Sequence, residues 1–112
     1  MKKVLLDECL PAQLKRELAE HQVRTVRNQG WNGIKNGRLL ALMDSEFDVF
    51  ITVDDGLEHQ QNTQNLSVGI IVLEVFHNTM KYIGPLIPQI QSAVDRIRPG
   101  KIIRIEGQTK PS

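Results

Sequence analysis

Apolar residues along the chain fall into two patterns, short continuous runs and longer segments with helical spacing. The continuous runs are rich in branched side chains and cover residues 3–6, 49–53, 68–73 and 102–105. Such runs are typical of strands that are buried on both faces, as in a parallel sheet. A weaker run over residues 23–26, whose apolar positions are flanked by arginines, predicts a further strand. The pattern therefore predicts five short strands.

Two segments with helical spacing lie between the first three strands. Pro11 suits the first turn of a helix, and that helix carries a stripe of leucines spaced four residues apart. The stripe consists of Leu10, Leu14 and Leu18. Residues 28–37 contain two Asn-Gly turn signals, and Asn36 can cap the helix that follows. The buried face predicted for this second helix consists of Leu39, Leu40, Met43 and Phe47.

A third segment with helical spacing covers residues 80–97, where apolar side chains recur in steps of three and four. Pro85 and Pro88 divide this segment, because a proline inside a helix removes a backbone hydrogen bond. We therefore predict that the firm helix begins near Pro88. The pair Pro99-Gly100 ends it.

Strands that alternate with helices indicate an α/β protein whose mostly parallel sheet is covered on both faces. We predict a three-layer α/β/α sandwich with a five-stranded sheet. It forms a single domain over residues 1–107, and a frayed tail follows over residues 108–112. Right-handed crossovers bring the carboxyl ends of all strands to one edge. Ligands of open α/β sheets bind at that edge.

The composition narrows the class of protein only slightly. Apolar residues make up 40% and charged residues 24% of the chain, as in ordinary globular domains. The net charge of +1 is too small to indicate electrostatic binding to nucleic acid or membrane, although it allows a local basic patch. A single cysteine, Cys9, permits no intrachain disulfide, and no signal peptide is evident. We expect a cytoplasmic protein that contacts no membrane.

Two of the predicted strands end in carboxylates. Asp7 and Glu8 follow the first apolar run, and Asp54 and Asp55 follow the run over residues 49–53. Carboxylates of this kind are ligands for Mg²⁺, which can activate water and stabilise charge on a phosphate. Each acid could instead cap a helix, because aspartate is a favoured N-cap residue. For Asp7 and Asp54 together we favour a site, provided that their strands are close neighbours.

Four segments of the chain resemble the DUF5615 family of PIN-like proteins. The segments are residues 5–11, 30–40, 47–54 and 60–62. The resemblance covers nearly the whole chain and implies a compact PIN-type sandwich. It also implies an endoribonuclease that uses Mg²⁺ or Mn²⁺, hydrolyses the phosphodiesters of RNA and acts as the toxin of a toxin–antitoxin pair. A small antitoxin protein is then the implied partner, and a homodimer is left open.

The resemblance assigns the metal site residue by residue. The acid of the first strand maps to Asp7 and the acid of the Thr-x-Asp motif maps to Asp54, so both are candidate catalytic residues and metal ligands. Glu8 is a further candidate ligand. PIN nucleases usually carry another acid at or in the middle helix, but the corresponding helix of this chain opens with Lys35-Asn36-Gly37-Arg38, and Asp44 and Glu46 lie late in it. Asp55 could supply the missing charge and is a third candidate catalytic residue.

Several polar side chains are candidates for binding substrate, each with a structural alternative. They are Gln60, Gln61, Asn62, Asn36, Lys35 and Trp31. The amides could orient a nucleotide or tie down their own loop. Lys35 could hold a phosphate or be solvated. Trp31 could stack on an unpaired base or anchor a turn against the core.

Two other functions fit the same residues. In a phosphoacceptor receiver domain, Asp54 would be phosphorylated and Asp7 and Glu8 would hold Mg²⁺. Against this, a receiver needs a hydroxyl residue after the fourth strand and a lysine after the fifth, where the chain has Glu74 and Glu106. The third hypothesis is a non-catalytic PIN-like module that binds RNA or a protein partner.

Overall fold

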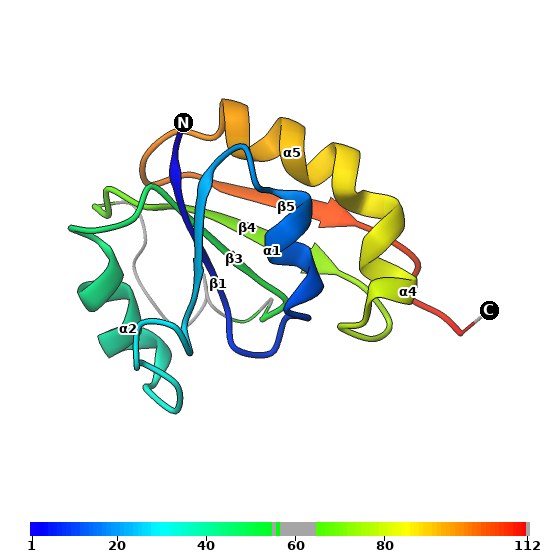
Figure 1. Cartoon of the computed structure of the whole chain (residues 1–112), viewed down its shortest axis with the longest axis horizontal. Helices are drawn as coiled ribbons and strands as arrows, with labels where there is room; N and C mark the ends of the chain where they lie inside the picture. Colours follow the sequence, from blue (N-terminus) through cyan, green and yellow to red (C-terminus); the bar gives the residue numbers. More distant parts are fainter. Residues whose placement is uncertain (55, 57–64, 112) are drawn as a thin grey trace.

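The computed structural model describes residues 1–54, 56 and 65–111, in which five strands form one sheet (Figure 1). All neighbouring strands are parallel, and their order across the sheet is β2-β1-β3-β4-β5. The strands are β1 (Lys3–Leu6), β2 (Gln22–Thr25), β3 (Val49–Thr52), β4 (Gly69–Glu74) and β5 (Ile102–Glu106). The predicted α/β sandwich with a five-stranded parallel sheet is confirmed.

The helices occupy the connections in which helical spacing was found. They are α1 (Gln13–Glu17), α2 (Asn36–Met43), α4 (Met80–Ile83) and α5 (Ile87–Arg96), with the 3₁₀ turn η1 (Gly84–Leu86) between the last two. Pro85 lies in η1 and Pro88 in the first turn of α5, where a missing N–H costs little. The predicted division at the two prolines is therefore confirmed.

Two details of the helix starts differ from the prediction. Helix α1 begins only at Gln13, so Pro11 precedes it and instead accepts a turn hydrogen bond from Leu14 N–H at 3.1 Å. The N-cap of α2 is Lys35 and not Asn36, and no side chain caps this helix. The amide of Asn36 is engaged elsewhere, as described below.

Successive residues of each strand face opposite sides of the sheet, and each side has its own core. On one side, Val4, Leu6, Val49 and Ile51 pack with Leu14 of α1, with the flanking Leu10 and Leu18, and with isoleucines of α4 and α5. On the other side, Leu5, Phe50, Ile70 and Val72 pack with Leu39, Leu40 and Met43 of α2. Figure 1 shows α1 and α5 over one face and α2 beyond the other. This double burial explains why the strand sequences are continuously apolar.

The end of α5 packs so closely on the start of β4 that a side chain would not fit between them. A Cβ atom placed on Gly69 would lie 2.9 Å from Ile97 Cγ1 and 3.1 Å from Arg98 O. The glycine therefore allows the helix to approach the sheet.

Within the described residues, no helix has the length and apolar character needed to cross a membrane.

The strand order creates a reversal of direction in the middle of the sheet. From β1 the chain moves outward to β2, and from there it returns to the far side of β1 to form β3. The connections that leave β1 and β3 consequently diverge. Ligands of doubly wound sheets bind at such a switch point, beyond the carboxyl ends of the two strands.

Candidate functional site

Asp7 and Asp54 lie at the carboxyl ends of the two strands that form the switch point. In the register of β1 and β3, Leu6 lies opposite Ile51, and Asp7 N–H donates to Ile51 O at 3.0 Å. Asp54 follows two residues after the end of β3. Both side chains are half-buried. The two acids therefore lie at one edge of the sheet, as predicted, and the condition that their strands be neighbours is met.

Thr52, the last residue of β3, connects the two aspartates. Its hydroxyl donates to Asp7 Oδ2 at 2.6 Å and accepts the backbone N–H of Asp54 at 3.1 Å. Thr52 has no exposed surface, and it is the buried polar residue of the described core. A buried hydroxyl without partners would be destabilising, so both hydrogen bonds contribute to fixing this edge. The sequence analysis missed this role, although a hydroxyl that ends an apolar run was a usable signal.

Asp54 is held from two further directions. Asn36 Nδ2 donates to Asp54 Oδ2 at 2.7 Å, and Gly56 N–H donates to Asp54 Oδ1 at 3.0 Å. A carboxylate only accepts hydrogen bonds when ionised, so the amide nitrogen of Asn36 must face it. The second bond is the turn that an aspartate forms with the amide two residues on. These donors orient the carboxylate.

Glu8 faces a different part of the molecule. Its Oε1 accepts the backbone N–H of Gly33 at 3.1 Å, while its own N–H donates to Asp7 Oδ1 at 2.8 Å. The side chain therefore braces the loop between β2 and α2, and it leaves Asp7 and Asp54 as the two carboxylates of the switch point. Asp55 lies outside the described residues.

The remaining substrate-binding candidates divide into three groups. The indole of Trp31 is half-buried and packs edge-on against Phe47, with ring centroids 6.1 Å apart, in the anchoring arrangement that the sequence allowed. Lys35 is exposed at the start of α2, and Asn36 contacts Asp54. Gln60, Gln61 and Asn62 lie outside the described residues.

Cys9 lies two residues after Asp7 in the chain and contacts the loop after β4. Burial raises the pKa of its thiol, and the negative charge of Asp7 raises it further, whereas hydrogen bonds from Val53 and Asn78 act in the opposite direction. Asn78 Nδ2 also donates to Cys9 O at 2.6 Å. A thiol whose pKa is raised is a poor nucleophile, so we assign Cys9 no catalytic role. The pKa of its thiol depends instead on the charge of the neighbouring Asp7.

The two aspartates have the chemistry that a hard divalent cation requires. Each carboxylate oxygen can accept more than one partner, and the hydrogen bonds above use one position on each oxygen. Mg²⁺ is commonly bound through one or two carboxylates, with water and phosphate oxygens completing its shell. Thr52 and Asn36 supply the outer hydrogen bonds that orient such ligands. Asp7 and Asp54 are therefore of the ligand type that Mg²⁺ or Mn²⁺ takes.

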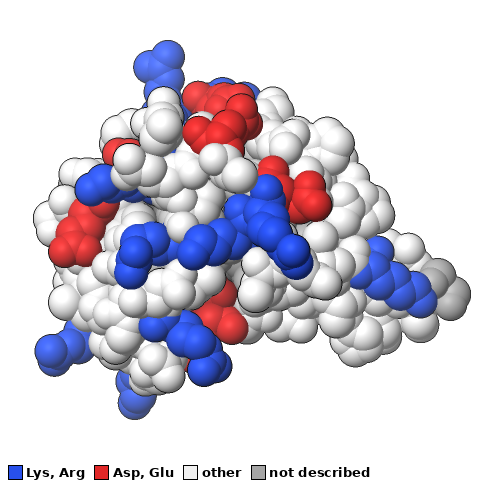
Figure 2. All heavy atoms as spheres, in the orientation of Figure 1, with Lys and Arg blue, Asp and Glu red and all other residues white. Residues whose placement is uncertain are grey.

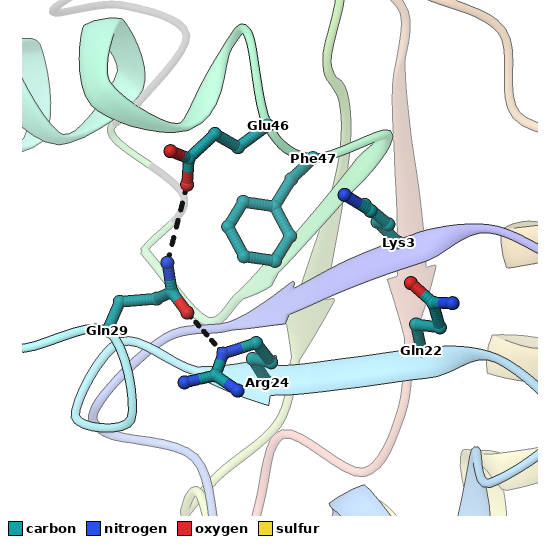
Figure 3. A pocket seen from close by; sticks show the side chains of 6 residues that line it. All are labelled: Lys3, Gln22, Arg24, Gln29, Glu46 and Phe47. Carbon is teal, nitrogen blue, oxygen red and sulfur yellow. Dashed lines mark hydrogen bonds between the residues drawn. The ribbon is translucent and has the colours of Figure 1, made fainter.

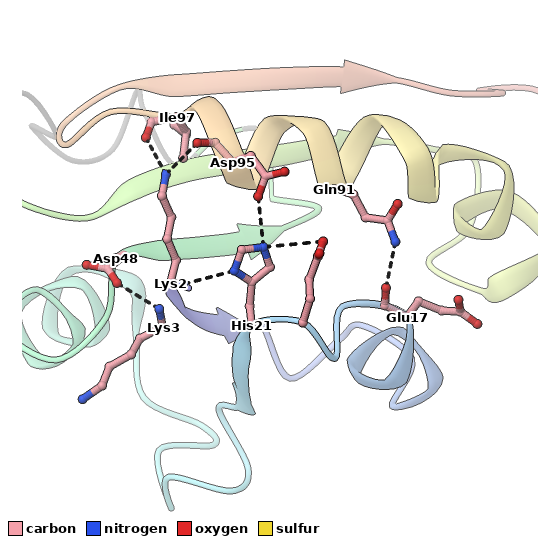
Figure 4. A network of polar contacts seen from close by, with 9 residues as sticks. Lys2, Lys3, Glu17, His21, Asp48, Gln91, Asp95 and Ile97 are labelled. Carbon is pink, nitrogen blue, oxygen red and sulfur yellow. Dashed lines mark hydrogen bonds and ion pairs between the residues drawn. The ribbon is translucent and has the colours of Figure 1, made fainter.

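A second group of charged side chains lies at the opposite, amino-terminal edge of the sheet (Figure 4). It consists of Glu20, His21 and Asp95, and it is the one group of three such ligands within reach of one another in the described part of the chain. His21 Nδ1 accepts Lys2 N–H at 3.1 Å, so this nitrogen carries no proton. His21 Nε2 then carries the proton and donates to Asp95 Oδ1 at 3.1 Å.

Together with Lys2, these residues join separate segments of the chain through hydrogen bonds and do not form a metal centre. We call this group of contacts the clasp. A metal on His21 Nε2 would displace the proton, and Nδ1 would still face an N–H donor in place of the acceptor that usually supports a ligating histidine. Lys2 Nζ adds to the clasp by donating to Asp95 O and Ile97 O at 3.3 and 3.0 Å. The ring of His21 is only 6% exposed, although its backbone belongs to a loop.

A cavity of about 340 Å³ lies beside the edge strand β2, also away from the two aspartates (Figure 3). Phe47 forms its floor, and its rim consists of Lys3, Gln22, Arg24, Gln29 and Glu46. Gln29 connects the rim, because it accepts from Arg24 Nε and donates to Glu46 Oε2 at 3.4 Å. Lys3 begins β1 and Asp7 follows its end, so the cavity and the switch point lie at different ends of the strands.

The charged surface is mixed in sign, with basic side chains gathered on one face. Figure 2 shows Lys and Arg side chains in a band across this face and smaller groups of acidic side chains around it. Helix α1 and the β2 region, which lie in front in Figure 1, carry exposed Lys15, Arg16, Arg24 and Arg27. The net charge of +1 therefore conceals a local basic surface.

Comparisons of the chain with protein-family models, with curated proteins and with solved structures find no match.

Proposed function

We propose that the protein is a metal-dependent ribonuclease of PIN type, in which Asp7 and Asp54 hold a Mg²⁺ or Mn²⁺ ion. The observation that supports this proposal most strongly is the hydrogen-bonded series Asp7–Thr52–Asp54 at the switch point of a parallel sheet. Two half-buried carboxylates oriented by buried partners are suited to ligand binding. The resemblance of the sequence to PIN-like proteins supplies the reaction class.

In the proposed mechanism, the residues of the chain hold the two aspartates in position and attract the RNA. When bound, the cation supplies an activated water and neutralises charge on the scissile phosphodiester of RNA. Thr52 keeps Asp7 in place through a 2.6 Å hydrogen bond, and Asn36 keeps Asp54 in place through one of 2.7 Å. The basic surface around α1 and β2 provides a sequence-independent attraction for the RNA backbone.

Cleavage of a single-stranded RNA by the purified protein tests this proposal. We expect cleavage that requires Mn²⁺ or Mg²⁺, is abolished by EDTA, and falls at least about 100-fold in Asp7→Asn and Asp54→Asn. Asp48→Asn is the matched control, because Asp48 precedes the same strand and receives Lys3 N–H at its exposed amino end. Undiminished cleavage by Asp54→Asn would refute the proposal. Failure of the protein to bind millimolar Mn²⁺ in calorimetry would favour a non-catalytic binding module.

A receiver domain is the second candidate, because its strand order is the flavodoxin-like 2-1-3-4-5 order found in this sheet. Asp54 would then be the phosphoacceptor. The strands that should supply a hydroxyl and a lysine end instead in Glu74 and Glu106, which lie opposite one another in the register of β4 and β5. A stable phosphoprotein after incubation with acetyl phosphate and Mg²⁺ would reverse the ranking of the two candidates.

We also propose that the ribonuclease is the toxin of a toxin–antitoxin pair, with a small protein as its inhibitor. This part of the proposal is supported by the family resemblance alone. Induced expression of the chain should arrest growth of a bacterial host, and Asp54→Asn should relieve the arrest. Equal growth with both forms, at equal expression, would contradict the toxin assignment and leave the ribonuclease proposal to the cleavage assay.

A further inference from the structure

An exposed aromatic side chain lies in the loop that follows β4, the strand next to β3, at the same edge of the sheet as the two aspartates. β4 is the neighbour of β3, and after its end the chain continues through Val75, Phe76 and His77. Phe76 is 38% exposed, and of the described residues only Met1 is another large hydrophobic residue exposed to this degree. Single exposed apolar residues are common on protein surfaces, so Phe76 is distinguished by its position after the strand next to β3 and by its aromatic neighbours.

Phe76 belongs to a cluster of three rings. Its centroid lies 4.2 Å from that of His77 and 5.7 Å from that of Tyr82, with interplanar angles of 56° in both pairs. His77 and Tyr82 meet edge to face at 5.9 Å, and Lys81 Nζ lies 5.4 Å from the Tyr82 centroid. Tyr82 is buried, so it forms the base of the cluster, while Phe76 and His77 are exposed. A cationic side chain therefore stands beside an aromatic platform.

The loop that carries Phe76 is fixed relative to the aspartates. Phe76 N–H donates to Gln108 O at 2.8 Å, which attaches the loop to the extension of β5. Asn78 Nδ2 donates to Cys9 O at 2.6 Å, and Cys9 is two residues after Asp7. The platform is thus connected through one side chain to the strand end that carries Asp7.

We propose that Phe76, supported by His77 and Tyr82, forms a subsite that stacks an unpaired nucleobase of the RNA bound at Asp7 and Asp54. This inference rests on the proposed function and adds to it the residue that contacts a base. Unpaired bases expose their faces and stack on aromatic side chains, whereas bases in a duplex do not. The ammonium of Lys81 suits the phosphate that accompanies each base.

Two observations favour a nucleobase over other occupants. The exposed apolar surface consists of one ring and not an extended patch, which is too little to anchor a protein partner. Trp31, the other aromatic residue that the sequence suggested for stacking, packs against Phe47 and the core. Of these two aromatic side chains, Phe76 is therefore the more exposed one.

The experiment measures binding and cleavage separately. Binding of a fluorescent single-stranded RNA is measured by anisotropy in EDTA, and kcat and KM are measured with Mn²⁺. The variants are Phe76→Leu, which keeps an apolar side chain without a π face, and Phe76→Trp, which restores one. We expect Phe76→Leu to weaken binding and raise KM by about 5- to 100-fold with little change in kcat, and Phe76→Trp to recover the wild-type values. Unfolding curves of both variants serve as folding controls.

The outcomes separate this inference from the proposed function. Cleavage with a KM that is the same in wild type and Phe76→Leu would overturn the subsite and leave the ribonuclease intact. RNA binding that depends on Phe76, without any cleavage, would support the subsite and overturn the ribonuclease. Absence of RNA binding by the wild-type protein would overturn the subsite whatever the cleavage result.

Discussion

The hydroxyl of Thr52 donates a 2.6 Å hydrogen bond to the carboxylate of Asp7, although 45 positions separate the two residues in the chain. The same hydroxyl accepts the N–H of Asp54. One buried atom thus connects the ends of β1 and β3, holding the carboxylate of Asp7 and the backbone of Asp54. The site depends on this contact because carboxylates that bind a cation gain affinity when their positions are fixed in advance.

Replacing Thr52 with valine should therefore weaken the site as well as the fold. The variant keeps the shape of the side chain but loses two hydrogen bonds, so we expect a loss of about 1–3 kcal/mol in unfolding free energy. Mn²⁺ affinity should fall by about 10-fold or more. Urea unfolding and Mn²⁺ calorimetry measure the two effects.

Thr25→Val is the control for this substitution. Thr25 ends β2, where its hydroxyl accepts Asn28 N–H at 2.9 Å, so its loss should reduce stability without changing Mn²⁺ affinity. Equal Mn²⁺ affinity in wild type and Thr52→Val would show that Thr52 does not support a cation site.

Asn36→Asp should make the protein depend on divalent cations for stability. The substitution replaces the amide that donates to Asp54 with a second carboxylate, and the two negative charges repel. We expect a loss of about 1 kcal/mol in the absence of metal, because both groups are partly exposed. Mn²⁺ should then raise the melting temperature of the variant more than that of wild type.

Asn28→Asp introduces the same charge on an exposed loop, where Lys15 Nζ lies 3.1 Å from the side chain. This control should respond to Mn²⁺ as the wild type does. If both variants respond equally, the charge change and not its place beside Asp54 would explain the effect.

Cys9 should report the charge of Asp7. Because burial and Asp7 both raise the pKa of the thiol, the thiolate fraction at pH 8 is lower than for a free cysteine, and alkylation by iodoacetamide should be slow. Asp7→Asn removes one of the two causes, which lowers the pKa and should accelerate alkylation. A Mn²⁺ ion on Asp7 should act in the same direction.

Measurement of alkylation rates from pH 7 to 10 checks this prediction, because the rate profile gives the thiol pKa directly. The profile of Asp7→Asn should lie at lower pH than that of wild type. If neither Mn²⁺ nor the Asp7→Asn substitution shifts the profile, the assigned proximity of Cys9 to a charged Asp7 would be contradicted. Asp48→Asn, at the other end of the sheet, should leave the profile where it is.

The clasp at His21 should contribute to stability and not to metal binding. His21→Leu leaves Lys2 N–H without its acceptor and removes the bond to Asp95, so we expect a loss of about 1–3 kcal/mol in urea unfolding. Glu20→Gln should change stability by less than about 0.5 kcal/mol, since Glu20 is exposed and 3.8 Å from the ring. A loss of Mn²⁺ affinity in Glu20→Gln would contradict this assignment.

The sequence predicted those features that follow from chain-wide patterns. The continuous apolar run over residues 49–53 predicted a strand buried on both faces, and the parallel topology then required Asp7 and Asp54 to share an edge. The prolines of residues 85–88 predicted the break before α5 for a local reason, since proline lacks an N–H. These predictions needed no knowledge of how individual side chains pack.

The partners of individual polar side chains could not be predicted, because they depend on tertiary distances. Asn36 looked like a helix cap, and only the approach of α2 to the end of β3 makes Asp54 its partner. The ring of His21 contacts Asp95 of α5, which lies 74 positions away in the chain. Phe76 carried no pattern at all, since one exposed aromatic residue becomes informative only when the site beside it is known.

The most direct test of the account is the location of Mn²⁺ in a crystal of the protein, determined from its anomalous scattering. We predict a peak within about 2.0–2.3 Å of a carboxylate oxygen of Asp7 and of Asp54, with no comparable peak at His21 and Asp95. The peak should vanish in crystals of Asp54→Asn. A well-ordered crystal in millimolar Mn²⁺ with no peak between Asp7 and Asp54, or with the ion bound at His21 instead, would contradict the account.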